Sequence, residues 1–232
     1  MFPLRDENPT EITPFLTVAI IAANVAVWLL LQNGGVGTPF LESLCDWGTL
    51  PGELTGALPP GELVGPEQLR CRAGGATWST LITSMFMHGS WTHLIMNMWF
   101  LWVFGNNIED AFGHAGFLVF YLAAGVLGSG AHVVSAPASA VPTVGASGAI
   151  SGVMGAYLVL YPRVRVHTLF IIVIFIRVFP LPAWLLLGEW FLLQLFYGSM
   201  ATGAAGGVAF WAHIGGFVAG VVLAFGGGRD RA

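Results

Sequence analysis

Long apolar runs separated by short polar stretches dominate this chain, and their lengths predict helices that cross a membrane. A bilayer core of about 30 Å needs roughly 20 helical residues. Six runs approach that length, although the fourth and fifth are shorter than the others. We predict spans at Phe15–Gln32, Trp91–Asp110, Gly116–Val134, Gly148–Tyr161, Pro182–Phe196 and Ala204–Phe225.

A seventh apolar run, Val166–Phe179, is rich in β-branched residues, contains Arg177 and is followed by two prolines. Arginine accumulates on the cytoplasmic side of membrane proteins, so its placement indicates the number of spans. With six spans, all arginines except Arg70 and Arg72 share one face, whereas a seventh span would move three of them outside. We therefore predict six spans with both termini cytoplasmic. Val166–Phe179 is then a hairpin or a surface helix at the cytoplasmic interface.

Composition supports a membrane protein and excludes one class of partner. Only 9% of the 232 residues are charged and 56% are hydrophobic, whereas soluble domains carry roughly 25% charged residues. The net charge is −4 and lysine is absent. No basic surface can therefore follow a phosphate backbone, and nucleic acid is not an expected partner. We predict one domain over 1–232, with a cytoplasmic tail at 1–13, a long external loop at 33–90 and a cytoplasmic tail at 226–232.

The segments before and after the first span allow further predictions. Met1–Glu11 is acidic and lacks the basic region of a signal peptide, so we expect the first span to be retained. Loops as long as Asn33–Thr77 are uncommon without a function. Both cysteines, Cys45 and Cys71, lie in this loop on the oxidising side, where a disulfide and two free thiols are both open. Thr80–His88 is expected to form a short helix on the outer surface.

Ser147 is a candidate nucleophile, because it lies among small residues in Gly145-Ala146-Ser147-Gly148 at the start of the fourth span. A packing role is the alternative. Gly148 and Gly152 have the spacing that lets another helix approach closely, and serines in membrane helices often bond to their own helix.

The depth of three polar residues favours catalysis. Ser147 and Arg163, His213 and Arg229, and His93 and Glu109 are each separated by the same interval along the sequence. At about 1.5 Å per residue, all three side chains lie about 24 Å from the inner boundary, on helices that run in the same direction. Polar groups inside a membrane usually mark function, so we predict a hydrolytic site at this level.

Each residue of this site has an expected role. His213 accepts the proton of Ser147 as general base. The Ser147 amide, in the first turn of its helix, together with His93 and Asn97 at i and i+4, supplies donors to an oxyanion. His88 is expected to support the site. The structural alternatives are a hydrogen-bonded core histidine for His213, an interhelical network for His93 and Asn97, and a loop position for His88.

Acidic residues are scarce at this depth. Glu189 on the fifth span is the one candidate, and we assign it no role, so a Ser–His dyad is expected rather than a triad. Glu109, with Gly105 and Gly113, is expected to cap a helix and form a turn at the inner end of spans two and three. Zinc is not expected at His88, His93 and His213, because their spacing gives no compact pair and no carboxylate accompanies them. We predict no cofactor.

Together, Gly145-Ala146-Ser147-Gly148, His93-xxx-Asn97, and Ala212-His213 followed by Gly216-xxx-Gly220 resemble the rhomboid family of intramembrane serine proteases. Pro3–Thr10 is similar to the start of its bacterial members. The resemblance implies an all-α membrane protein, a six-helix bundle with a short central fourth helix and a cavity open to the outside. It also implies substrate entry between spans two and five.

The resemblance implies a function as well. We expect a serine endopeptidase of the bacterial cytoplasmic membrane that cleaves transmembrane segments of other proteins, with the bilayer and those substrates as its partners. Two departures concern how the site is held. Many relatives have a Trp-Arg pair where Ser79 follows Trp78 here, and some have a tyrosine stacked on the catalytic histidine where this chain has Ser151. A rhomboid-like protein that binds membrane helices without cutting, a small transporter and a metal-dependent hydrolase remain alternatives.

Overall fold

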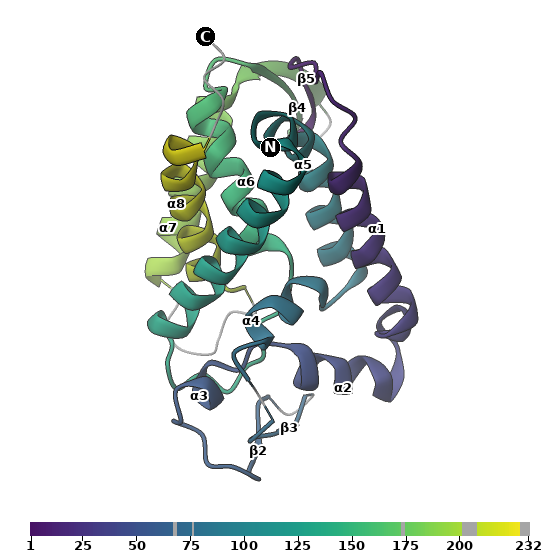
Figure 1. Ribbon diagram of the computed structural model, residues 1–232, viewed down its shortest axis with the longest axis vertical. Coiled ribbons are helices and arrows are strands. Elements are labelled where there is room, and N and C mark those ends of the chain that lie inside the picture. The colour runs from purple at the N-terminus through teal and green to yellow at the C-terminus, as the bar shows by residue number, and fades with distance from the viewer. Residues whose placement is uncertain (67–68, 76, 173–174, 201–207, 228–232) are drawn as a thin grey trace.

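Helices packed side by side along the long axis of the molecule form the body of the protein (Figure 1). The computed structural model describes residues 1–66, 69–75, 77–172, 175–200 and 208–227. The helices of the body begin and end close to the predicted spans, and the predicted start of the sixth span, Ala204, lies outside the described residues. They are α1 (Phe15–Leu30), α5 (Trp91–Ser135), α6 (Ser147–Leu160), α7 (Ala183–Met200) and α8 (Phe210–Gly227).

α5 contains both the second and the third predicted span. Its helical geometry is interrupted at Gly113, where φ is +70° and ψ is 165°, a conformation that favours glycine. The interruption divides α5 into segments 91–112 and 114–135. Within the described residues, α5 is the one helix with the length and composition to cross a membrane, and α1, α6 and α8 are apolar but shorter. The six-span count and the orientation of the termini therefore stay predictions.

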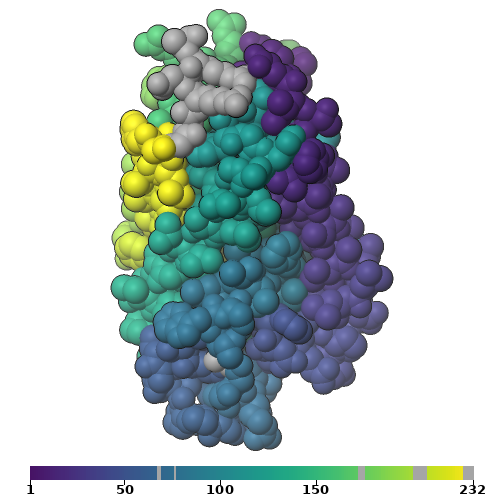
Figure 2. Space-filling view, viewed as in Figure 1, coloured from purple at the N-terminus to yellow at the C-terminus, as the bar shows by residue number. Residues whose placement is uncertain are grey.

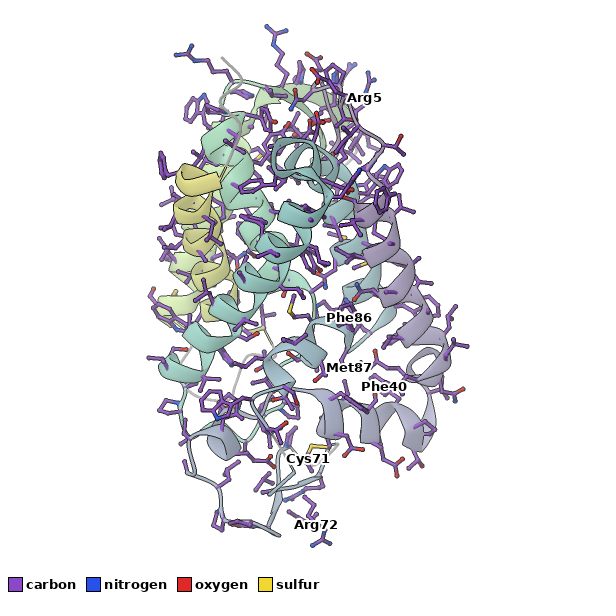
Figure 3. All side chains as sticks on the ribbon, in the orientation of Figure 1. Arg5, Phe40, Cys71, Arg72, Phe86 and Met87 are labelled. Carbon is purple, nitrogen blue, oxygen red and sulfur yellow. A yellow bond between two sulfur atoms is a disulfide. The ribbon has the colours of Figure 1, made fainter. Side chains whose placement is uncertain are left out.

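The first loop is more ordered than its sequence suggested. It forms a layer at one end of the bundle, shown in blue in Figure 2. A disulfide joins Cys45 to Cys71, which settles the open alternative in favour of a bridge (Figure 3). Short elements make up the layer: η1 (Asn33–Gly35), α2 (Gly37–Trp47), α3 (Pro51–Leu54), β2 (Leu63–Val64), β3 (Cys71–Arg72), α4 (Thr80–Thr83) and η2 (Ser84–Phe86).

A small antiparallel sheet closes the opposite end of the bundle (Figure 1). The hairpin of β4 (Arg165–Ile172) and β5 (Phe175–Pro182) is one of the two forms predicted for Val166–Phe179. β1 (Phe2–Asp6) pairs with the other edge of β4. Our all-α prediction did not include β1, which lies within the predicted tail 1–13. β1 forms because the backbone groups at the edge of β4 need partners.

Side chains from α5 and α6 fix the N-terminal strand. The indole Nε1 of Trp99 donates to the Pro3 carbonyl at 2.6 Å. The Asp6 carboxylate accepts from the Tyr157 hydroxyl at 2.5 Å and from Asn107 Nδ2 at 2.7 Å. Burial raises the pKa of Asp6, and these hydrogen bonds oppose that shift. The strand thereby ties the two helices together at this end. Arg5 lies at this end of the molecule and Arg72 lies at the far end (Figure 3), which agrees with the prediction that these two arginines lie on opposite faces of the membrane.

Glu109 caps the N-terminus of α1, so the capping role holds, but the capped helix is the first span and not span two or three. Its buried carboxylate accepts from the Leu16 amide at 3.0 Å, and from the Thr17 amide and hydroxyl at 2.7 Å each. His114 Nδ1 lies 2.6 Å from the same carboxylate. The first amides of a helix have no partner within it, so this one side chain satisfies donors that are otherwise buried without an acceptor.

We expect Glu109→Ala to destabilise the protein by about 1.5–3 kcal/mol, the range for losing hydrogen bonds to a charged group. Thermal unfolding in detergent measures the loss. The exposed Glu42 offers a matched control, and Glu42→Ala should leave the unfolding temperature within about 1 °C of wild type because surface substitutions have small effects. Equal unfolding temperatures for the two variants would contradict the capping role.

α6 lies at the centre of the bundle and packs directly on the backbone of α8. Every residue from Gly148 to Tyr157 is buried. A Cβ atom at Gly216 would lie 2.0 Å from the Gly148 carbonyl oxygen, and one at Gly220 would lie 1.9 Å from the Gly152 carbonyl oxygen. Since real Cβ atoms never approach so closely, glycine is required at both positions of α8. The close packing predicted for these glycine pairs is confirmed.

Candidate active site

The glycine contacts bring the N-terminal ends of α6 and α8 together, and with them the two predicted catalytic side chains. Ser147 is the first residue of α6, and His213 lies in the first turn of α8. His213 Nε2 lies 2.8 Å from Ser147 Oγ, within hydrogen-bond distance. This is the separation that proton transfer between a nucleophile and its base requires.

α7 holds the His213 ring from the other side. His213 Nδ1 lies 2.9 Å from Gln194 Oε1, and the Trp190 ring lies 6.0 Å from the imidazole, tilted by 36°. Trp190 and Gln194 are four residues apart, so they share one face of their helix. Gln194 was not among the residues predicted for the site. The one signal for it was an amide in an otherwise apolar run.

Ser151 does not replace the stacking tyrosine of some relatives. Its hydroxyl donates to the Ser147 carbonyl at 2.6 Å, a bond within its own helix that is common for serine in apolar helices. Contacts from α7, and not Ser151, therefore hold the His213 ring.

His93 is placed to donate into the site. Gly89 N donates to His93 Nδ1 at 3.4 Å, which leaves Nε2 as the nitrogen that carries a proton. The His93 amide donates to Ser90 Oγ at 3.1 Å, the N-cap of α5. His93 Nε2 lies directly against Gly145, where an added Cβ would approach it to 2.6 Å. Gly145 also has φ of +120°, so both space and backbone conformation require glycine there.

Asn97 lies one turn along α5 from His93, on the same face. It is buried, and its Nδ2 has no hydrogen-bond partner among the described residues. Buried donors without a partner are uncommon and call for an explanation. The Ser147 amide is a further donor, because the first turn of α6 offers it no acceptor within the helix.

His88 lies behind His93 rather than in the reacting centre. The two rings meet edge to face with centroids 5.1 Å apart. Burial, reinforced by the neighbouring His93, lowers the pKa of His88 to about 3, so its imidazole is neutral at physiological pH. Gln32 brackets the backbone of His88: it accepts from the amide at 2.8 Å and donates to the carbonyl at 2.9 Å. His88 therefore packs against His93 without reaching Ser147, and its supporting role stays a prediction.

The first loop braces the segment that leads into Ser147. Thr49 and Thr143 exchange backbone hydrogen bonds at 2.9 and 2.8 Å, and Gly145 N donates to the Ser84 carbonyl at 2.9 Å. Trp78, at the position of the missing Trp-Arg pair, is 65% exposed and contributes little to this contact. Backbone pairing and the disulfide anchor the loop instead.

A cavity of about 610 Å³ contains these groups. Residues of α5, α6, α7 and α8 line it, so both the second and the fifth predicted spans contribute to its walls. Glu189 is not among the described residues that line it. The lining includes Ser147, His213, His93 and Asn97, together with Met96, Phe100, Met154, Trp190 and Gln194.

Comparison with known proteins places the chain in a family. A family model described as the rhomboid domain matches residues 75–230, about two thirds of the sequence. The chain belongs to the rhomboid family. This confirms the resemblance drawn from the sequence motifs, and it makes the chain an integral membrane protein.

Several curated proteins are similar to this rhomboid. Rhomboid protease GluP of Bacillus subtilis is 34% identical over 145 residues, which are 62% of this chain and 24% of that protein. Rhomboid protein 1 of Saccharomyces cerevisiae mitochondria is 33% identical over 153 residues, which are 62% of this chain and 40% of that protein. The rhomboid chain thus matches only about a quarter to two fifths of the length of these relatives. They come from a bacterium and from mitochondria, so membership of the family does not specify the membrane.

Proposed function

We propose that this rhomboid is an intramembrane serine endopeptidase that uses a dyad of Ser147 and His213. The contact of 2.8 Å between His213 Nε2 and Ser147 Oγ carries the proposal, in a cavity also lined by Asn97, whose Nδ2 has no partner among the described residues. The similarity to a protein named as a rhomboid protease supports the same reaction class.

The reaction follows from the positions of the donors and acceptors. Ser147 Oγ attacks the carbonyl carbon of the scissile peptide while its proton passes to His213 Nε2. The oxyanion that forms accepts hydrogen bonds from the Ser147 amide, His93 Nε2 and Asn97 Nδ2. His213 then gives its proton to the leaving amine, and an acyl-enzyme remains. A water molecule, deprotonated by His213, releases the second product and restores Ser147.

A transmembrane segment of another protein is the proposed substrate. The cavity is lined by Met96, Phe100, Met154 and Trp190, which suit an apolar chain. A helix in a bilayer satisfies its backbone groups internally, so the substrate must unwind locally before its carbonyl reaches Ser147. We place the protein in a bacterial cytoplasmic membrane, with six spans and both termini in the cytoplasm.

Purified protein in detergent, incubated with a single-span model substrate, tests the proposal. We expect cleavage that a chelator does not inhibit, and covalent labelling of Ser147 by a serine-directed phosphonate. A rhomboid-like protein that only binds membrane helices would retain the substrate uncut and would leave Ser147 unlabelled. That result would overturn the proposed activity and favour the binding alternative.

Asn97→Ala removes one oxyanion donor. We expect kcat to fall by roughly 10- to 1,000-fold, the scale measured for such donors elsewhere, while KM changes little because the bond forms in the transition state. Initial rates over a range of substrate concentrations measure both constants. Thermal unfolding of the same preparation shows whether the variant is folded, and a folded variant with wild-type kcat would exclude Asn97 from the oxyanion site.

A further inference from the structure

We propose that Gln194 is a positioning residue that holds His213 in the tautomer and orientation needed to accept the Ser147 proton. The inference rests on the proposed function and adds a third participant to the dyad, supplied by α7. It goes beyond the sequence motifs, none of which includes Gln194.

Hydrogen bonding at the two ring nitrogens of His213 supports this role. A neutral imidazole carries one proton, and the partner of one nitrogen decides which nitrogen is free to act as a base. Gln194 Oε1 lies 2.9 Å from Nδ1 and can only accept. Nδ1 therefore donates to it, and the lone pair of Nε2 is directed at Ser147 Oγ, 2.8 Å away.

The ring plane is also set by α7. Trp190, one turn before Gln194, lies against the imidazole, and Phe210 meets it from the start of α8 at 6.5 Å and 82°. These aromatic contacts restrict the tilt of the ring but provide no acceptor for Nδ1. Among the described residues, Gln194 is the partner assigned to that nitrogen, so the choice of tautomer depends on it.

An amide suits this position better than a carboxylate. A carboxylate within the apolar layer of a membrane carries a large desolvation penalty. The carbonyl dipole of Gln194 accepts the same hydrogen bond without a net charge. It also stabilises the imidazolium that forms when Nε2 receives the Ser147 proton, because Nδ1 still donates to Oε1 in that state.

Three substitutions test the role. Gln194→Met keeps the length of the side chain and removes the acceptor, and we expect kcat to fall roughly 10- to 100-fold, part of the contribution of a general base, with KM unchanged. The rate of Ser147 labelling by a serine-directed phosphonate should fall by the same factor. Gln194→Glu keeps an oxygen acceptor at the same reach, and because burial penalises its charge it should recover part of kcat and not all of it. Leu195→Met, on the neighbouring exposed position of α7, is the matched control and should behave as wild type.

Wild-type kcat in Gln194→Met, or equal losses in Gln194→Met and Gln194→Glu, would overturn the inference. If Gln194→Met does not fold, Gln194→Asn replaces it, since the shorter amide withdraws the acceptor and must show the same loss of kcat. Wild type and Ser147→Ala are assayed in parallel. Absence of cleavage by wild type would refute the proposed function, whereas Ser147-dependent cleavage that is insensitive to Gln194 would refute only this inference.

Discussion

Ser147→Ala should abolish cleavage of a single-span substrate without changing the thermal stability of the protein. The substitution removes the hydroxyl that contacts His213 Nε2 at 2.8 Å. Loss of the nucleophile of a serine protease costs about 10⁶-fold in kcat, which is below detection in a gel or mass-spectrometric assay. His213→Ala should have an effect of the same size, and the double variant should be no worse than either single one, because the two residues act as a unit.

A serine elsewhere on the chain provides the control. Ser199 is exposed on α7, and its hydroxyl bonds to the Phe196 carbonyl at 2.8 Å. Ser199→Ala should cleave at the wild-type rate. Cleavage by Ser147→Ala at a rate comparable with wild type would show that another group carries the reaction, and it would remove the basis of the proposed function.

Gly220→Leu should destabilise the bundle by about 3 kcal/mol or more and remove activity together with stability. A Cβ at position 220 would lie 1.9 Å from the Gly152 carbonyl oxygen, which is backbone and cannot rotate away. Overpacking in a filled core costs 1–3 kcal/mol and occasionally more. α8 must move away from α6 to accept the side chain. That movement separates His213 from Ser147, because the two residues lie on these two helices.

Gly226, six residues further along α8, provides a matched control for Gly220→Leu. A Cβ there meets nothing within 4 Å, so Gly226→Leu should keep both the unfolding temperature and the rate of phosphonate labelling. We expect Gly220→Leu to lower both. Similar behaviour of the two variants would mean that α6 and α8 are not in backbone contact.

Much of the helical body could be predicted from the sequence, because membrane helices have a strong local signal. The apolar runs locate α1, both segments of α5, α6 and α7 to within a few residues. The glycine spacing also identifies α6 and α8 as neighbours, since glycine four residues apart clears one face of a helix. The proximity of Ser147 and His213 followed from equal distances to polar boundaries. These are all properties of residues near one another in the sequence.

The strand at the N-terminus could not be predicted from the sequence in this way. β1 is short, and its own pattern carries no strand signal strong enough to separate it from a tail. It is a strand because β4, more than 150 residues later, presents an unpaired edge, and because Trp99 and Tyr157 hold it there. Pairing between segments so distant is a property of the fold.

Gln194 was missed for a related reason. An uncharged amide in an apolar run has no periodicity or charge that marks it. The acidic residue Glu189 on the same helix was the polar residue of this span that the sequence singled out. Only the rotation of α7 about its axis decides which of the two lines the cavity. That rotation depends on packing against α8, including the stacking of Phe191 on Phe217 at 4.5 Å.

The complete burial of the central part of α6 has a consequence for the tolerance of this protein to change. Residues 148–157 are all buried within the bundle, and Ile150, Ser151 and Met154 border only the cavity, so none of them can adjust to a larger neighbour by turning toward lipid. In a saturation library scored for folded protein, we expect these ten positions to accept fewer amino-acid substitutions than the positions of any other helix. The outward positions of α1, such as Leu30 at 84% exposure, should accept almost any apolar residue. Directed evolution of substrate preference would therefore have to draw its variation from the walls of the cavity on α5 and α7.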